Sequence, residues 1–128
     1  VKYPGKAGAF NWDRQKLHEV MQPLRDLQKR YGYPVYVGEF SAVRWIGDSG
    51  NRYLRDVIDL FERYGWSWTY HKFRGAQVWD AEMSNYDRNK QSRQASTPRM
   101  ELLKRYFNRN SCVGTHRECL KQQVGHLL

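Results

Sequence analysis

Two ionisable side chains stand near the ends of short apolar segments, where a functional group would be well placed. Glu39 follows Val35-Tyr36-Val37-Gly38, and His71 comes near the end of residues 66–73. A carboxylate in so apolar a segment is costly to bury unless it is paired or used, so Glu39 is a candidate functional residue. An ion pair between Glu39 and Arg44 is the alternative, and the residue pattern leaves both interpretations open. Gly38 would let another backbone or a ligand approach closely.

His71 belongs to a segment whose side chains alternate between the two faces of an expected strand. One face carries Ser67, Thr69, His71 and Phe73, and the other carries Trp66, Trp68, Tyr70 and Lys72. If this segment pairs in register with the one that holds Glu39, the imidazole is level with the carboxylate. It could then orient the carboxylate or bond a sugar hydroxyl. A hydrogen-bonded core histidine is the alternative interpretation.

Trp79, Asp80 and Glu82 follow in a polar stretch, residues 74–96, that shows no apolar period. In parallel α/β architectures ligands bind at the C-terminal ends of the strands, and this loop would lie over that end. Trp79 could be a platform for a sugar ring, because the axial C–H face of a sugar is apolar. The alternative is a lid that packs only on its own loop.

An alternation of helices and strands is expected to position these residues. Apolar side chains recur at three- and four-residue steps in 12–31, 51–64 and 98–107, which predicts helices there. Residues 34–42 and 66–73 are short, apolar and rich in β-branched and aromatic types, which predicts buried parallel strands. A strand–helix–strand order with a crossover of ~14 residues is the parallel βαβ unit, so the predicted class is α/β.

Several residues indicate where these elements begin and end. Those that favour helix ends are Asn11 or Asp13, Gly32, Gly65 and Thr97-Pro98. Pro23 predicts a kink or a late start in the first helix. The glycine-rich start, residues 1–11, is expected to be a loop, and residues 47–50 are expected to be a loop that caps the second helix.

The composition limits the classes of partner. The chain has 128 residues, 40% hydrophobic and 27% charged, with five Trp and nine Tyr. Its net charge of +9 raises nucleic acid as a partner, but the basic residues are interleaved with acids and form no run, so no nucleic-acid binding is predicted. No apolar run approaches the ~18 residues of a membrane span, so no membrane partner is predicted. Cys112 and Cys119 lack zinc spacing, and either a local disulfide or two free thiols would fit.

Three stretches follow one another at short intervals: Tyr33-Pro34-Val35-Tyr36-Val37-Gly38-Glu39-Phe40-Ser41, the helical stretch Tyr53-Leu54-Arg55-Asp56-Val57-Ile58-Asp59-Leu60-Phe61-Glu62, and Gly65-Trp66-Ser67-Trp68-Thr69-Tyr70-His71. Together they resemble the last third of glycoside hydrolase family 5, the cellulase family. The similarity covers roughly residues 1 to 108. It implies a partial (β/α)8 TIM barrel, from helix six to helix eight. Residues 1–110 would belong to the barrel and residues 111–128 would be a tail of unknown role.

The resemblance also implies roles for particular residues. Glu39 matches the family's nucleophile, a carboxylate that attacks the anomeric carbon to form a glycosyl-enzyme, which water then hydrolyses. His71, Trp68 and Trp79 would contact the substrate, a β-glucan or related polysaccharide, and His71 stands where many members carry a Trp. The family needs no metal and no organic cofactor. Secretion is the expectation for the parent family, and the location of this chain stays open.

The second catalytic carboxyl of the family has no counterpart in this chain. The family's acid/base glutamate follows an Asn on strand four, and no Asn-Glu pair occurs here. Retention needs a second carboxyl about 5 Å from the first, and Asp80 or Glu82 could approach without matching the family position. The prediction is therefore the nucleophile half of an endoglucanase-like retaining hydrolase, with a homo-oligomer or a complementing barrel half as partner. The alternative is a non-catalytic fragment that binds carbohydrate or assembles.

Overall fold

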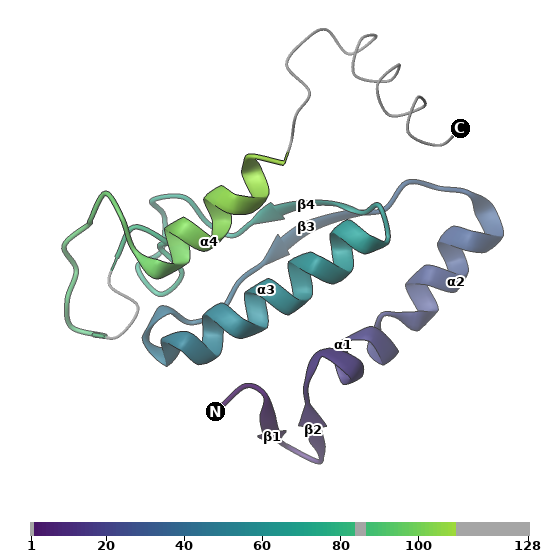
Figure 1. The fold of residues 1–128 in the computed structure, drawn as a ribbon, viewed down its shortest axis with the longest axis horizontal. Helices are drawn as coiled ribbons and strands as arrows, with labels where there is room; N and C mark the ends of the chain where they lie inside the picture. The colour runs from purple at the N-terminus through teal and green to yellow at the C-terminus, as the bar shows by residue number, and fades with distance from the viewer. Residues whose placement is uncertain (1, 84–86, 110–128) are drawn as a thin grey trace, which may run out of the picture.

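The computed structural model describes residues 2–83 and 87–109, and Figure 1 shows their path. The elements are β1 (Gly5–Ala7), β2 (Phe10–Trp12), α1 (Arg14–Val20), α2 (Gln22–Tyr31), β3 (Tyr36–Phe40), the 3-10 turn η1 (Arg44–Ile46), α3 (Asp48–Arg63), β4 (Ser67–Tyr70) and α4 (Pro98–Phe107). β3 and β4 are parallel and are joined through α3, so the predicted α/β class and the parallel βαβ unit are confirmed.

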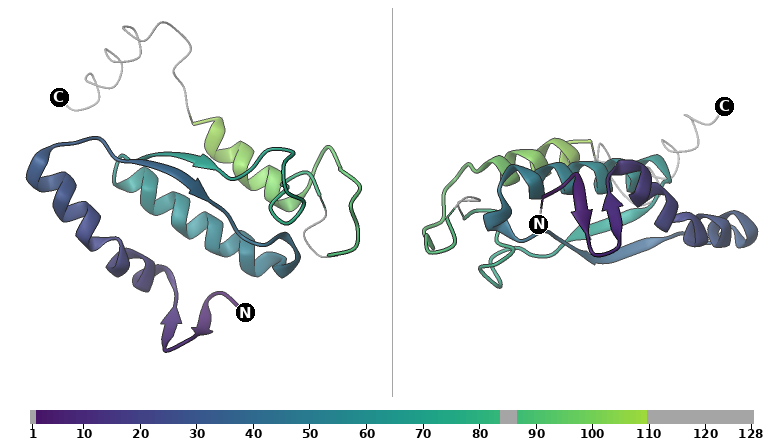
Figure 2. Two further views of the ribbon diagram at one scale, coloured as in Figure 1. Left: turned by 180° about the vertical axis from the view of Figure 1, so that it is seen from behind. Right: turned by 90° about the horizontal axis from the view of Figure 1, so that it is seen from below.

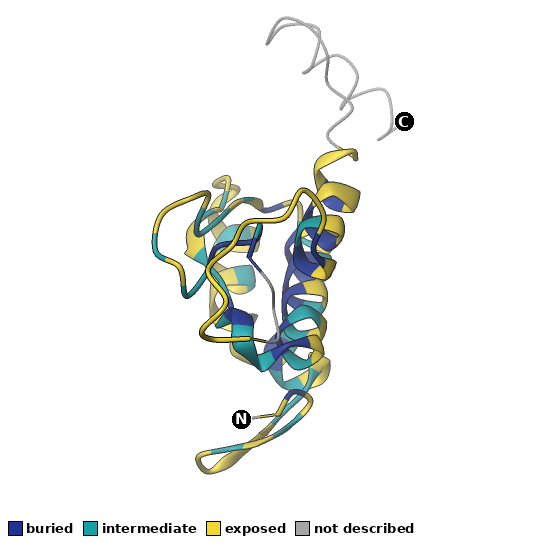
Figure 3. Cartoon of the chain, turned by 90° about the vertical axis from the view of Figure 1, so that its left-hand side faces the viewer, coloured by how far each residue is buried: buried dark blue, intermediate teal, exposed yellow. Residues whose placement is uncertain are grey.

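The parallel sheet is covered on one face by α3 and α4, as the right-hand view of Figure 2 shows. Leu54 and Ile58 of α3 and Leu103 of α4 are almost fully buried between the layers. Phe40 of β3 and Trp68 of β4 pack against them from the sheet. Figure 3 shows the buried residues gathered along the inner sides of the helices. The core therefore lies on the helix side of the sheet.

The predicted buried strand 34–42 is shorter and is covered on one face only. Val37 and Phe40 pack against the core, whereas Tyr36 is 64% exposed and the Glu39 side chain is 79% exposed. The apolar composition predicts cover on both faces, as in a complete parallel sheet. Two strands with helices on one side do not provide that cover, so the expectation of full burial is wrong for this chain.

The predicted alternation along β4 is confirmed. Trp66, Trp68 and Tyr70 pack toward the core, and Ser67 and Thr69 are exposed. The second predicted strand is again shorter than expected, since the paired part is Ser67–Tyr70.

Residues 1–11, for which the glycines predict a loop, contain most of an antiparallel hairpin instead. β1 and β2 pair Gly5 with Trp12 and Ala7 with Phe10. The Trp12 indole Nε1 also donates to the Ala7 carbonyl at 3.2 Å. Strands of three residues are too short for an apolar alternation to stand out in the sequence.

The predicted helix 12–31 is two helices that meet at Met21. Asp13 caps α1, because its carboxylate accepts a hydrogen bond from the Lys16 main-chain nitrogen at 2.8 Å. Pro23 lies in the first turn of α2, where its missing N–H group is tolerated. Gly32 ends α2 in the left-handed region, with φ 68°. The sequence therefore predicted the cap, the interruption and the end correctly.

α3 begins at Asp48 instead of residue 51, so part of the predicted loop 47–50 is helical. Gly50 lies in its first turn, and a Cβ atom there would stand 2.9 Å from an Arg99 guanidinium nitrogen and 2.9 Å from Ile46 Cγ1. Glycine is needed at this point because α3 passes close to Arg99. The composition of residues 47–50 suggests a loop, but most of this run is helical because glycine at position 50 fits against Arg99 in the folded chain.

Replacing Gly50 by Ala is expected to lower the free energy of unfolding by about 1–3 kcal/mol, as overpacking does. In an open helix position the same change stabilises by roughly 0.5–1 kcal/mol. Here the methyl group must displace Ile46 and the Arg99 guanidinium, which is held by main-chain oxygens. Urea unfolding measures the change, and the exposed Arg52→Ala on the same helix is the control, expected within about 0.5 kcal/mol. A stabilised Gly50→Ala variant would contradict this account.

The chain between β4 and α4 has no helix and no strand of its own in the described part, as predicted. It lies at the end to which both parallel strands point (Figure 1). Thr97 then caps α4, since its hydroxyl accepts from the Met100 main-chain nitrogen at 3.0 Å. Among the described residues, none of the helices has the length and apolar character needed to cross a membrane.

Candidate functional site

Glu39 lies on a β-bulge near the C-terminal end of β3. The pairing with β4 shifts between Val37 and Phe40, so Gly38 and Glu39 together oppose the single residue Thr69. A bulge bends its strand and redirects a side chain, and bulges are common at barrel rims and beside active sites. The shift lets Val37 and Phe40 both pack on the helix side. Glu39 is left on the open side of the sheet.

Hydrogen bonds from β4 hold the backbone around the bulge. The Thr69 hydroxyl donates to the Gly38 carbonyl at 2.5 Å. The Tyr36 hydroxyl lies 3.0 Å from the same Thr69 oxygen, and it is the donor because the single Thr69 proton is already engaged. Beyond the bulge, the His71 main-chain nitrogen donates to the Phe40 carbonyl at 3.0 Å. The strand is therefore fixed on both sides of the candidate carboxylate.

Gly38 shows no close approach of another group among the described residues. A Cβ atom there would meet the Tyr36 ring at 3.6 Å, an ordinary contact distance. The expectation that Gly38 admits a neighbouring backbone is not met among residues 2–83 and 87–109.

His71 lies beside Glu39, as the parallel register predicts. Its Nδ1 atom is 3.9 Å from Glu39 Oε1, and its side chain is 27% exposed. That separation is within ion-pair range but too long for a hydrogen bond. The imidazole keeps access to solvent, so it can orient the carboxylate or contact a ligand placed next to it.

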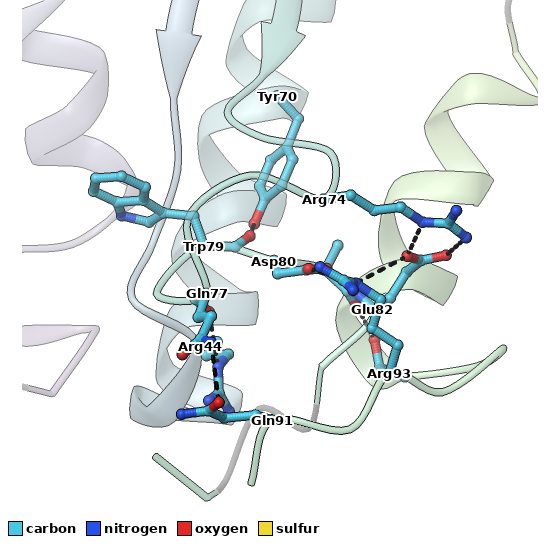
Figure 4. Close-up of polar contacts among 11 residues, drawn as sticks. Arg44, Tyr70, Arg74, Gln77, Trp79, Asp80, Glu82, Gln91 and Arg93 are labelled. Carbon is cyan, nitrogen blue, oxygen red and sulfur yellow. Dashed lines mark hydrogen bonds and ion pairs between the residues drawn. The ribbon is translucent and has the colours of Figure 1, made fainter. Parts of the chain in front are cut away.

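Trp79 returns over the same end of the sheet and packs against His71. The two ring centroids are 5.0 Å apart with an interplanar angle of 60°, an edge-on contact. The Trp79 main-chain oxygen accepts a hydrogen bond from the Tyr70 hydroxyl at 2.6 Å (Figure 4). The structure therefore brings Glu39, His71 and Trp79 together, and these three residues form the candidate site.

Trp68 lies on the opposite face of the sheet from His71 and is not part of the candidate site. Its indole nitrogen donates to Glu62 Oε1 at 2.7 Å, and its ring stacks on Phe107 with centroids 5.7 Å apart. Trp68 lines an apolar pocket of about 350 Å³ together with residues of β4 and α4 and with Phe73 of the loop after β4. The proposed contact between Trp68 and substrate therefore has no geometric support from this chain.

Arg44, the alternative partner of Glu39, lies in the interior with none of its surface exposed. Its donors reach the main-chain oxygens of Gln77 (2.9 Å), Val78 (2.9 Å), Asp87 (2.5 Å) and Arg88 (3.0 Å). Figure 4 shows Arg44 beneath the loop that carries Gln77 and Trp79. Arg44 thus joins the loop after β3 to the loop after β4.

Asp80 and Glu82 are engaged with arginines. Asp80 is 1% exposed, and its Oδ2 accepts from Arg93 Nε at 3.0 Å. The two Glu82 oxygens accept from Arg74 at 2.7 and 3.1 Å (Figure 4). The hydrogen bonds from Arg74 lower the pKa of Glu82 against the opposing effect of desolvation. A carboxyl with a lowered pKa is ionised at neutral pH and is unsuited to act as a general acid.

Glu82 is expected to stabilise the fold above its ordinary pKa of 4.5 and to lose that effect in acid. Because its pKa is lower in the folded than in the unfolded state, the contribution is complete above the unfolded value and disappears as the pH falls through the folded value. The difference in Tm between wild type and Glu82→Gln should be constant from about pH 7 to 5 and shrink below that. Thermal unfolding followed by circular dichroism measures this difference.

Glu19→Gln is the control for Glu82→Gln, because Glu19 forms an exposed i,i+3 pair with Lys16 at 3.3 Å. Such exposed pairs contribute little, so its Tm should stay close to that of wild type. A Glu82→Gln difference that grows on acidification would contradict the assignment.

No group of three His, Cys, Asp or Glu side chains suited to a metal ion occurs among residues 2–83 and 87–109. Cys112 and Cys119 lie outside the described residues, as does the tail predicted from residue 111.

Arg99 is a supporting residue that the sequence pattern did not indicate. It is fully buried, and its guanidinium donates to the Ala42 and Val43 carbonyls and to the Tyr70 hydroxyl. Burial lowers the pKa of Arg99 by desolvation, which the Tyr70 hydroxyl partly offsets. An arginine directly after Pro98 carries no local sign of burial, because its partners are 29 to 57 residues away.

Two solved structures are similar to this chain in fold. One, described as a glycoside hydrolase, has a TM-score of 0.58 and 24% identity over 75% of this chain and 27% of its own. The other, a hyperthermophilic endo-β-1,4-glucanase in complex with substrate, has a TM-score of 0.57 and 21% identity over 80% of this chain and 29% of its own. The chain thus spans 27% and 29% of their lengths. No protein-family model and no curated protein sequence matches it.

Proposed function

We propose that this chain is the nucleophile half of a retaining glycoside hydrolase of family 5 type that acts on β-linked polysaccharide. Glu39 is the nucleophile, His71 and Trp79 contact the sugar, and no metal or organic cofactor takes part. Residues 1–110 are the C-terminal portion of a (β/α)8 barrel, and residues 111–128 are a tail without an assigned role. The observation that carries the proposal is an exposed carboxylate on a β-bulge, next to an imidazole, in a fold similar to part of two glycoside hydrolases.

The geometry supports a nucleophilic role for Glu39 in three respects. Its side chain is 79% exposed, so a sugar can reach it. The bulge is fixed from β4 by Thr69, so the carboxylate starts from a defined backbone position. His71, with Nδ1 3.9 Å from Glu39 Oε1, is close enough to orient the carboxylate toward the sugar. In the proposed reaction, Glu39 attacks the anomeric carbon as the leaving oxygen departs, and water then releases the sugar with retention.

The proposal places the acid/base carboxyl outside this chain. Protonation of the leaving oxygen requires a second carboxyl about 5 Å from the nucleophile. Asp80 and Glu82 are held by Arg93 and Arg74, and the pKa of Glu82 is lowered, so neither is suited to supply that proton. A complementing barrel segment would therefore provide it.

The 128-residue chain alone is expected to hydrolyse β-1,4-glucan at least about 10²–10⁴-fold more slowly than a complete endoglucanase, since general acid catalysis contributes that much. Aryl β-glycosides with stable leaving anions need less protonation, so their release should be affected less. Reducing-sugar and aryl-release assays measure the two rates. Turnover of glucan by this chain at the rate of a complete enzyme would overturn the half-barrel proposal.

A non-catalytic carbohydrate-binding fragment is the second candidate. The observation in its favour is that the site offers aromatic and polar contacts while Asp80 and Glu82 are engaged with arginines. Titration with a β-1,4-linked gluco-oligosaccharide separates the two candidates. Binding that Trp79→Ala removes and Glu39→Gln leaves intact, together with no aryl release, would favour the second.

A further inference from the structure

A continuous set of hydrogen bonds connects α4 with the loop that carries Trp79. Arg99, fully buried at the start of α4, donates to the Tyr70 hydroxyl at 3.3 Å. That hydroxyl donates in turn to the Trp79 main-chain oxygen at 2.6 Å (Figure 4). A guanidinium has donors only, so the Tyr70 oxygen must accept from Arg99 and its one proton is available for Trp79. The direction of both bonds is therefore determined.

The loop around Trp79 is held by individual hydrogen bonds to other parts of the chain. Residues 71–83 contain no helix or strand that would hold the indole in place. Three successive carbonyls are instead fastened individually: Arg44 donates to those of Gln77 and Val78, and Tyr70 donates to that of Trp79. Of these, the bond to Trp79 is the one that joins the loop to β4, whose last residue, Tyr70, directly precedes His71.

The Tyr70 ring itself has a fixed position. It packs edge-on against Phe40 with ring centroids 6.2 Å apart and lies against the core between α3 and α4. The packing of the ring therefore positions the Tyr70 hydroxyl that donates to the Trp79 main-chain oxygen. The ring centroids of Trp79 and His71 are 5.0 Å apart, and His71 Nδ1 lies 3.9 Å from Glu39 Oε1.

We propose that Tyr70, held by Arg99, is a positioning residue that fixes Trp79 against His71 and so sets the orientation of His71 toward Glu39. The inference rests on the proposed function, because it assigns a support to the same site. Tyr70 touches neither the sugar nor the reacting atoms in this scheme; it acts through Trp79.

Tyr70→Phe tests the inference, because it removes the bridging hydroxyl and keeps the packed ring. Two-dimensional NMR of the full chain reports the Trp79 indole N–H signal, assigned with Trp79→Phe, and the His71 ring C–H signals, which sense the neighbouring indole. Both sets should shift in Tyr70→Phe, while the other four of the five Trp signals stay in place. Affinity for a β-1,4-linked gluco-oligosaccharide should fall about three- to tenfold, the change that loss of one hydrogen bond produces.

Tyr106→Phe is the matched control. Tyr106 is buried on α4, and its hydroxyl donates to Asp59 Oδ1 at 2.7 Å. Tyr106→Phe therefore also removes one hydrogen-bonded phenolic hydroxyl from the core, but at a different place from Tyr70→Phe. Tyr106→Phe should leave the Trp79 and His71 signals unchanged. If Tyr70→Phe merely lowers Tm as Tyr106→Phe does, with both signals in place, the positioning role is overturned.

Two further outcomes keep the inference separate from the proposed function. If the wild-type chain binds no oligosaccharide, the proposed function loses its support, while the Trp79 and His71 signals still decide whether Tyr70 positions them. Should Tyr70→Phe fail to fold, Arg99→Lys keeps the charge and shortens the donor, and it must move the same two sets of signals. An Arg99→Lys variant with unmoved signals would also overturn the role.

Discussion

A 2-deoxy-2-fluoro-β-glucoside with a dinitrophenolate leaving group is expected to label this chain covalently at Glu39. The dinitrophenolate anion is stable without a proton, so its departure does not need a general acid. The fluorine slows hydrolysis of the glycosyl-enzyme, so the ester between Glu39 and the anomeric carbon accumulates. Mass spectrometry of the digested protein measures one added sugar on the peptide that contains Glu39.

Glu39→Gln should lose the label completely, because an amide oxygen is a far weaker nucleophile than a carboxylate. Glu82→Gln is the matched control and should be labelled as wild type is, since Glu82 is bound to Arg74. A sugar found on the peptide of Asp80 or Glu82, or equal labelling of Glu39→Gln, would refute the assignment of Glu39 as nucleophile.

Arg99→Met is expected to lower the free energy of unfolding by roughly 2–4 kcal/mol. The guanidinium has no exposed surface and bonds to the Ala42 and Val43 carbonyls, the Tyr70 hydroxyl and Asn51 Oδ1. Its removal takes the guanidinium donors from the Ala42 and Val43 carbonyls, at about 1–3 kcal/mol for each buried acceptor left unsatisfied, partly offset because a desolvated cation is also removed. Small domains are stable by about 5–15 kcal/mol, so the loss would be a large share. Urea unfolding measures the change.

Arg105→Met provides the comparison on the same helix. Arg105 is exposed, and its Nε donates to the Glu101 carbonyl at 3.4 Å. Surface changes of this kind usually stay within about 0.5 kcal/mol. If Arg99→Met is as stable as Arg105→Met, the buried acceptors find other donors. The assignment of a stabilising role to Arg99 would then be wrong.

Local signals in the sequence were sufficient for most of the elements. Asp13 and Thr97 cap the helices that they were predicted to begin, and Gly32 ends the helix that precedes β3. The apolar periods placed α3 and α4, and the order strand–helix–strand predicted the parallel pairing that sets His71 beside Glu39. These features are predictable because caps, glycine ends and apolar periods act within a few residues of one another.

Some features of the fold could not be predicted from local signals in the sequence. The hairpin of β1 and β2 was missed because each strand is only three residues long. The composition of residues 47–50 suggested a loop, whereas Gly50 is helical and makes room for Arg99. The composition of β3 predicted burial on both faces. That prediction is wrong because helices cover only one face of the two parallel strands.

For the candidate site, the sequence by itself determined which residues have suitable chemistry: a carboxylate at 39, an imidazole at 71 and an indole at 79. The tertiary structure alone decided how they are arranged. It placed Glu39 on a bulge opposite Thr69, set Trp79 against His71, left Trp68 on the helix side and put Arg44 and Arg99 in the interior. The physical reason is separation along the chain, since each of these arrangements depends on side chains or strands that meet only when the chain folds.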